Sequence, residues 1–113
     1  MKEIKAYIKP HKLSVVSSAL HKIEKLTGMS VVDIRGFGRT RTKESEHGTF
    51  QDRMEYVVHV KIEIICHDEM VDEIVSTIEA SAYTGLHGDG KIYVSNVENA
   101  VRISTGERGI SAI

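Results

Sequence analysis

The stretch from Glu55 to Cys66, EYVVHVKIEIIC, constrains the fold of this chain more than any other. Its apolar positions alternate with polar ones: Val58, Val60, Ile62 and Ile64. A period of two predicts a long strand with one buried face and one polar face. Such a strand needs neighbouring strands and a covering layer, so the chain is committed to a sheet packed against other elements.

Similar patterns place further elements on both sides of this strand. Apolar and polar residues alternate again in EIKAYIK, residues 3–9, and apolar residues recur at helical spacing from Leu13 to Ile23 and from Met70 to Ile78. The expected order is a strand at 3–9, a helix from 13 to about 27, a strand at 30–35, the long strand from 55, a helix capped by Asp68 and running to 78, and a strand at 91–95.

A βαββαβ order predicts the α+β, ferredoxin-like plan, in which both helices cover one face of a four-stranded antiparallel sheet. The other face then needs a cover, which copies of the same chain can provide. With 113 residues and no internal repeat or linker, we expect a single domain over residues 1–113.

Composition argues against several classes of protein. A formal charge of -1 and the absence of Trp argue against a nucleic-acid partner. No apolar run is long enough to span a bilayer, so direct membrane insertion is not expected. The first ten residues lack the apolar core of a signal peptide, and one cysteine, Cys66, cannot form an internal disulfide. These features predict a cytoplasmic location.

Two regions have the character of loops. Residues 40–53, TRTKESEHGTFQDR, contain no aliphatic side chain, so we expect a long mobile loop there. In TGLHGDGK, residues 84–91, three glycines let backbone N–H groups approach an anion, and Lys91 adds a cation. Ile92 follows where a Walker P-loop needs Ser or Thr. The alternative is a turn whose glycines supply only positive φ.

Two further segments could contact phosphate. Gly36, Gly38 and Arg39 come at the end of the second predicted strand, and an arginine can hold phosphate through two hydrogen bonds. Arg102 introduces another cation near a flexible TGERG turn. The alternatives are a bulged strand end and a solvated tail.

Taken together, these motifs resemble the PII signalling family, which includes the nitrogen regulatory P-II proteins. The residues that carry the resemblance are KEIKAYIKPHKL, LTGMSVVDIRGFGR, VKIEII, TGLHGDGKIYV and VRISTGERGISAI. The resemblance implies a homotrimer that binds ATP or ADP in clefts between subunits. It also implies a mobile T-loop at about 38–55, a B-loop at about 83–91 and a C-terminal segment at about 102–113.

The resemblance assigns nucleotide-binding roles by position. Phosphate contacts fall on Gly36, Gly38, Arg39, Gly88, Gly90 and Lys91, with Arg102 reaching in from the adjacent subunit. Ile8, Ser30, Ile65 and Leu86 would border the base and ribose, and His87 and Asp89 complete the B-loop. Asp89 could also be a base for slow ATP hydrolysis, although a structural turn aspartate is favoured. The partner-binding T-loop contains Thr40, Arg41, Lys43, Glu44, His47, Phe50 and Asp52.

Four positions depart from the family pattern. Thr40 and His59 stand where many members use Gln and Lys to bind Mg²⁺ and 2-oxoglutarate, so 2-oxoglutarate is not expected as a ligand and a role for Mg²⁺ stays open. Asp52 stands where enteric members have a modified tyrosine. Ser104 replaces a second arginine, which favours ADP or AMP over ATP.

The expected function is that of a regulator, since no motif of an enzyme is present. Nucleotide binding would control a membrane transporter or metabolic enzyme, in nitrogen regulation for example, through the T-loop. One alternative is a metal-linked regulator of an efflux system, although the six histidines lack paired ligand spacing and no metal site is predicted. The other is a fixed trimeric adaptor without nucleotide switching.

Overall fold

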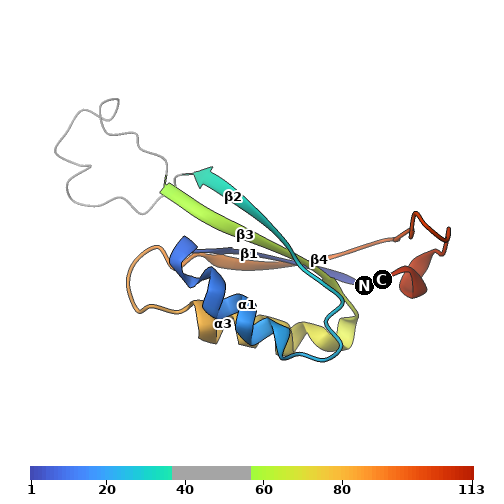
Figure 1. Cartoon of the computed structure of the whole chain (residues 1–113), viewed down its shortest axis with the longest axis horizontal. Coiled ribbons are helices and arrows are strands. Elements are labelled where there is room, and N and C mark those ends of the chain that lie inside the picture. Colours follow the sequence, from blue (N-terminus) through green and yellow to red (C-terminus); the bar gives the residue numbers. More distant parts are fainter. Residues whose placement is uncertain (37–56) are drawn as a thin grey trace.

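A computed structural model describes residues 1–36 and 57–113 of the chain. They form a four-stranded antiparallel sheet with both α-helices on one face (Figure 1). The elements are β1 (Lys2–Ile8), α1 (Leu13–His21), β2 (Ser30–Gly36), β3 (Val57–Cys66), α3 (Val71–Ala82) and β4 (Lys91–Asn96), with short 3₁₀ helices at Pro10–Lys12, Asp68–Met70 and Gly109–Ala112. The predicted ferredoxin-like α+β fold is confirmed. The predicted T-loop, residues 38–55, lies entirely outside the described residues.

The strand order is β2-β3-β1-β4, with β1 and β3 at the centre. Ile8 pairs with Val60 and Ile4 pairs with Ile64, so the apolar residues of both strands point to the same face. On β2, Gly36 pairs with Val57, which brings the end of β2 to the start of β3. This register fixes which residues meet at each end of the sheet.

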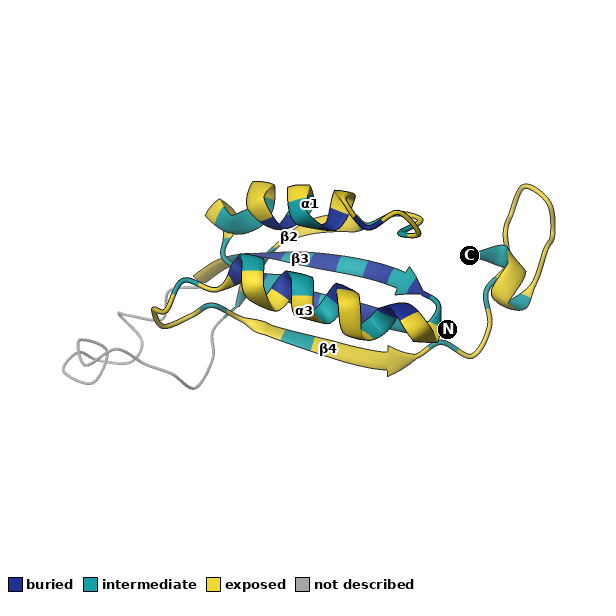
Figure 2. Ribbon diagram, turned by 90° about the horizontal axis from the view of Figure 1, so that it is seen from below, coloured by how far each residue is buried: buried dark blue, intermediate teal, exposed yellow. Residues whose placement is uncertain are grey.

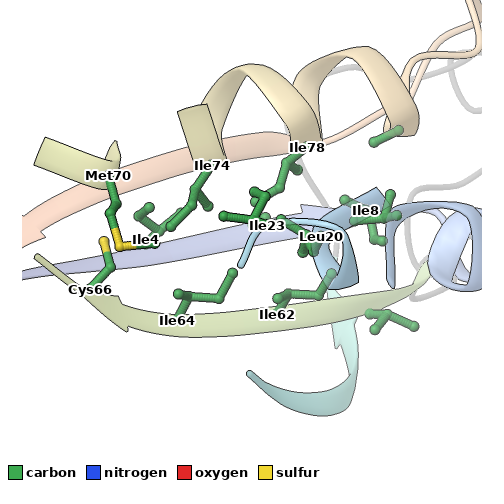
Figure 3. Close-up of a cluster of buried hydrophobic side chains, with 14 residues drawn as sticks. Ile4, Ile8, Leu20, Ile23, Ile62, Ile64, Cys66, Met70, Ile74 and Ile78 are labelled. Atoms are coloured by element: carbon green, nitrogen blue, oxygen red, sulfur yellow. The ribbon is translucent and has the colours of Figure 1, made fainter. Parts of the chain in front are cut away.

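The core lies between this sheet face and the two helices (Figure 3). It contains Ile4, Ala6, Ile8, Val16, Leu20, Ile23, Val60, Ile62, Ile64, Cys66, Met70, Ile74, Ile78 and Ala82. No polar side chain is buried among the described residues. The predicted alternation of β1 and both predicted helix faces are therefore confirmed. The alternation of β3 is confirmed from Val60 onward, whereas Val58, predicted on the same buried face, is 48% exposed.

The first helix is shorter than its apolar spacing predicted. It ends at His21 instead of near Thr27, and two tighter turns follow, in which Ile23 N–H donates to Leu20 and Leu26 N–H donates to Ile23. Ile23 is nevertheless only 9% exposed. Because Ile23 is buried from the turn, the apolar spacing typical of a helix continues in the sequence beyond the end of the helix.

Asp68 does not cap the second helix, contrary to the prediction. It lies inside the 3₁₀ turn, where His67 takes the N-cap position without a side-chain hydrogen bond. Its carboxylate instead accepts a hydrogen bond from the N-terminal ammonium of Met1 at 2.9 Å, and this bond lowers the pKa of Asp68. The carboxylate therefore ties the start of β1 to the start of α3.

The sheet face opposite the helices has no covering layer within the described residues. Tyr7 and Tyr93 pack edge to face on it, with ring centroids 5.8 Å apart, and Lys61 pairs with Glu63 at 2.8 Å. Beyond β4, the C-terminal arm (residues 97–113) projects past the end of the sheet (Figures 1 and 2). In the described part of the chain, no helix has both the length and the apolar content that a membrane span requires.

Candidate functional site

The glycine loop (residues 84–90) links α3 to β4 at the end of the sheet where β1 finishes. Gly85, Gly88 and Gly90 have φ values of 80°, 84° and 101°. At Gly90 a Cβ atom would lie 1.6 Å from the carbonyl oxygen of Tyr7, so only glycine fits. Backbone therefore packs directly on backbone where the loop meets β1.

The carboxylate of Asp89 closes this loop from inside. Its Oδ2 accepts hydrogen bonds from Thr84 N–H at 2.8 Å and Gly85 N–H at 3.3 Å, and its Oδ1 accepts one from the Thr84 hydroxyl. The Thr84 hydroxyl bond is the largest cause of the strongly lowered pKa of Asp89. The carboxylate is thus held ionised and turned toward the loop, which supports the structural reading of Asp89 over a role as a general base.

Lys9 joins the loop to the end of β1. Its ammonium lies 3.2 Å from Asp89 Oδ1 and donates to the Thr84 hydroxyl at 3.1 Å. The sequence reasoning missed both Lys9 and Thr84 as site residues. The sequence did contain a signal: Lys9 directly follows a predicted strand, and Thr84 begins the glycine string after a predicted helix. Polar residues at the ends of such elements can meet at one edge of the sheet.

The amide groups of the glycine loop divide into two sets. Those of Thr84, Gly85 and Leu86 are occupied by hydrogen bonds to Asp89 or to the Thr84 hydroxyl. Those of residues 87–90 form no hydrogen bond of good geometry with another residue of the described ranges 1–36 and 57–113, although residues 87–88 lie in a turn. Successive free N–H groups beside the exposed Lys91 can hold an anion.

His59, near the start of β3, also reaches this loop. Its Nε2 lies 3.2 Å from the carbonyl oxygen of Gly88. A carbonyl can only accept, so Nε2 carries the proton in this contact. His59 therefore supports the glycine loop. The sequence singled out His59 only because it stands where many family members have lysine, and it did not predict this contact.

A second candidate site lies at the opposite end of the sheet. A hollow of about 370 Å³ is lined by Glu3, Thr27, Gly28, Met29, Ser30, Glu63 and Ile65. Glu63 is held by Lys61, whose hydrogen bond lowers the pKa of the Glu63 carboxyl. Ile65 lies six positions after His59 on β3, so this hollow is about 20 Å from the glycine loop.

Comparison with known proteins matches this arrangement to one family. The family model for nitrogen regulatory protein P-II matches residues 1–107. Over all 113 residues the chain is 42% identical to the nitrogen regulatory protein P-II of Bradyrhizobium diazoefficiens and 41% identical to that of Azospirillum brasilense, covering 100% of each. This chain belongs to the nitrogen regulatory P-II family.

A solved structure of a P-II protein extends the match to three dimensions. The crystal structure of Arabidopsis thaliana PII bound to citrate aligns with a TM-score of 0.79 at 37% identity. The alignment covers 99% of this chain and 91% of the Arabidopsis chain. The P-II fold therefore extends across almost the whole molecule.

The site residues expected from the P-II resemblance fall into separate groups. Leu86, His87, Gly88, Asp89, Gly90 and Lys91 lie in or next to the glycine loop, and Gly36 ends β2 at the same end of the sheet. Ser30 and Ile65 line the distant hollow. Ile8 is 1% exposed and belongs to the core, so its side chain is closed to a ligand in this chain. Gly38, Arg39 and the predicted T-loop contacts, including Thr40, lie outside the described residues.

Arg102 lies on the C-terminal arm, at the end of the molecule away from the glycine loop (Figures 1 and 2). Its guanidinium lies 3.3 Å from Glu107, and Val101 forms an isolated bridge with Arg108. These contacts give the arm a small hairpin of its own. Within one chain, Arg102 and Lys91 therefore lie at opposite ends of the sheet.

The histidines and acids of the described ranges do not form a metal site. Among residues 1–36 and 57–113, no three His, Cys, Asp or Glu side chains gather closely enough to hold a metal ion. His47 falls outside these ranges.

Proposed function

We propose that this P-II protein binds adenine nucleotides in clefts between three copies of the chain. One observation carries the proposal: the anion-binding amides and the hollow lie at opposite ends of one sheet. A single AMP or ADP molecule, even when extended, is shorter than the ~20 Å between them along β3. It could use both groups only if one copy supplies the glycine loop and a neighbouring copy supplies the hollow.

The phosphates would bind at the glycine-loop end. The amides of residues 87–90 and the cation of Lys91 suit negative charge, and Gly36 marks where β2 leads toward Gly38 and Arg39. Backbone amides and an arginine together are a common way to hold phosphate. Asp89, His87 and Leu86 would shape the loop, with Leu86 73% exposed and free to cover a ligand.

The base and ribose would bind in the hollow of the neighbouring copy. Ser30 and Ile65 offer a polar and an apolar wall, as expected for an adenine face. The C-terminal arm, which contains Arg102, projects at this same end, and Arg102 could add a cation to the neighbour's phosphate site. Ser104 leaves that cation without a second arginine, which favours ADP or AMP over ATP.

The output would be control of a partner protein, not catalysis. P-II is a family of nitrogen regulatory proteins, and we expect a cytoplasmic regulator of a transporter or metabolic enzyme. Phosphate bound near Gly36 would bias the conformation of the T-loop, residues 38–55, and so its affinity for that partner. The T-loop residues 40, 41, 43, 44, 47, 50 and 52 would make the contact.

Calorimetry with ADP, ATP and AMP tests the binding step, combined with light scattering for mass. We expect a trimer that binds about one nucleotide per chain, following the symmetry of a closed ring. Lys91→Gln should weaken ADP about tenfold or more, whereas Lys25→Gln, an equal charge change after α1, should not. No heat with any nucleotide at millimolar concentration would favour the fixed adaptor.

Mixed trimers test whether the site is shared. Ser30→Trp should fill the hollow, and Lys91→Gln should damage the phosphate end. Each variant alone should bind ADP poorly. Co-expressed with different tags, the two should form mixed trimers in which some clefts pair an intact hollow with an intact loop. Recovered binding supports a shared site, and no recovery would show that both groups serve a single chain.

The absence of a 2-oxoglutarate response is a separate part of the proposal. ATP binding should be unchanged by 2-oxoglutarate with or without Mg²⁺, because Thr40 and His59 replace the residues that bind it in the family. The double variant Thr40→Gln with His59→Lys should introduce an enhancement. An enhancement already present in the unmodified protein would overturn this part alone.

A further inference from the structure

We propose that Lys9, Thr84 and Asp89 form a clamp that positions the free amides of residues 87–90, and that Asp89 is a positioning residue which does not touch the ligand. This inference deepens the proposed nucleotide function and rests on it for its ligand. It concerns the described contacts within one chain only. It assigns a role to three polar side chains, of which Lys9 and Thr84 carried no expected function.

Both oxygens of Asp89 are committed to the neck of the loop. Oδ1 contacts Lys9 at 3.2 Å and accepts from the Thr84 hydroxyl, while Oδ2 accepts from the amides of Thr84 and Gly85 at 2.8 and 3.3 Å. The side chain is 24% exposed. These bonds join position 89 to position 84, so the backbone between them is held as a closed ring.

Thr84 is the centre of the clamp. Its hydroxyl donates to Asp89 and accepts from Lys9 Nζ at 3.1 Å and from Leu86 N–H at 3.1 Å. A hydroxyl has one donor and two acceptor positions, so all of them are used. Serine can reproduce this pattern and valine, of similar shape, cannot.

The clamp also explains an acidic residue beside an anion site. An unpaired carboxylate there would repel phosphate, but Lys9, whose side chain is 19% exposed, neutralises it at close range. The clamp therefore predicts that neutralising Asp89 weakens phosphate binding, because the order of the loop is lost. If the carboxylate instead faced the ligand, neutralising it would remove a repulsion and phosphate would bind more tightly.

The first test compares Asp89→Asn with Asp72→Asn, which removes the same charge from the exposed first turn of α3. Calorimetry should show ADP affinity about tenfold lower for Asp89→Asn and unchanged for Asp72→Asn. Amide hydrogen exchange of the free protein should become faster at residues 84–90 in Asp89→Asn alone. Unchanged or tighter ADP binding by Asp89→Asn would overturn the proposal.

The second test uses Thr84→Ser and Thr84→Val, in case Asp89→Asn does not fold. ADP affinity and slow loop exchange should survive in Thr84→Ser and be lost in Thr84→Val, with thermal unfolding measured on both. Equal ADP affinity in the two variants would contradict the clamp. If the unmodified protein binds no nucleotide, the proposed function fails, and loop exchange still decides the clamp: faster exchange in Thr84→Val supports it and unchanged exchange refutes it.

Discussion

The glycine loop and the C-terminal arm differ in how far one chain completes them. The loop is tied to β1 by Lys9, to β3 by His59 and to itself by Asp89. The arm forms hydrogen bonds that are internal, such as Arg102 N–H to Glu107 at 2.9 Å, and after Val97 none reaches the sheet or helices within the described residues. Its Ile103 is 99% exposed.

This difference indicates where the molecule needs another copy. A loop held by polar bonds at both ends can keep its shape in a single chain. An arm that exposes Val101, Ile103 and Ile110 gains stability only if a surface covers them. We therefore expect substitutions in the loop to change the folding stability of the single chain, and substitutions in the arm to change the association between chains.

The largest expected effect is that of Gly90→Ala. The new Cβ would overlap the Tyr7 carbonyl at 1.6 Å, and φ is +101°, so the strand and loop must separate. We expect a loss of at least about 3 kcal/mol in the free energy of unfolding. Gly106→Ala in the arm is the control: φ is +75° but the space is open, so the loss should be about 1 kcal/mol. If urea unfolding showed similar losses of free energy for Gly90→Ala and Gly106→Ala, the expected difference between loop and arm would be wrong.

Ile103→Ser tests the arm. If a neighbouring copy buries this side chain, the change should remove about 1.5–3 kcal/mol per buried site from association. Light scattering over a dilution series should then show dissociation at higher concentration than for the unmodified protein. Val15→Ser, at an aliphatic position 49% exposed on α1, is the matched control and should leave the mass unchanged. Equal behaviour of both variants would show that the arm stays in solvent.

A smaller effect is expected for His59→Ala. The variant loses one exposed hydrogen bond to the Gly88 carbonyl, with a cost of at most about 1 kcal/mol in unfolding free energy. Hydrogen exchange should become faster in the glycine loop, but not in the arm. His67→Ala, which changes the N-cap position of the 3₁₀ turn before α3, is the control. Faster exchange in both variants would mean that His59 has no particular role.

The smallest expected effect is the loss of folding stability at low pH that is due to Asp89. The pKa of Asp89 is lowered in the folded state, so its contribution to stability is present above the pKa of the unfolded chain and is lost as pH falls toward the folded value. Between pH 6 and pH 3, roughly the range where an unfolded aspartate takes up its proton, stability should fall less in Asp89→Asn than in the unmodified protein. Parallel pH profiles from thermal unfolding would argue against the lowered pKa.

Much of the fold could be predicted because burial repeats at regular spacing. Alternation at Ile4, Ala6 and Ile8 placed β1 correctly, and the long alternation before Cys66 placed β3. The same logic placed the end of α1 too late, because Ile23 is buried from a turn as well as it would be from a helix. Spacing reports which side chains face the core, and the backbone that presents them can differ.

For the site, the sequence by itself determined which residue types could meet an anion: three glycines and Lys91 in one short string. Only the tertiary structure decided what surrounds them. Lys9 and His59 lie far from this string in the chain, and they reach it because strand pairing brings the ends of β1 and β3 together. Hydrogen bonds between distant residues depend on register and on distances within an ångström, which composition and periodicity do not encode.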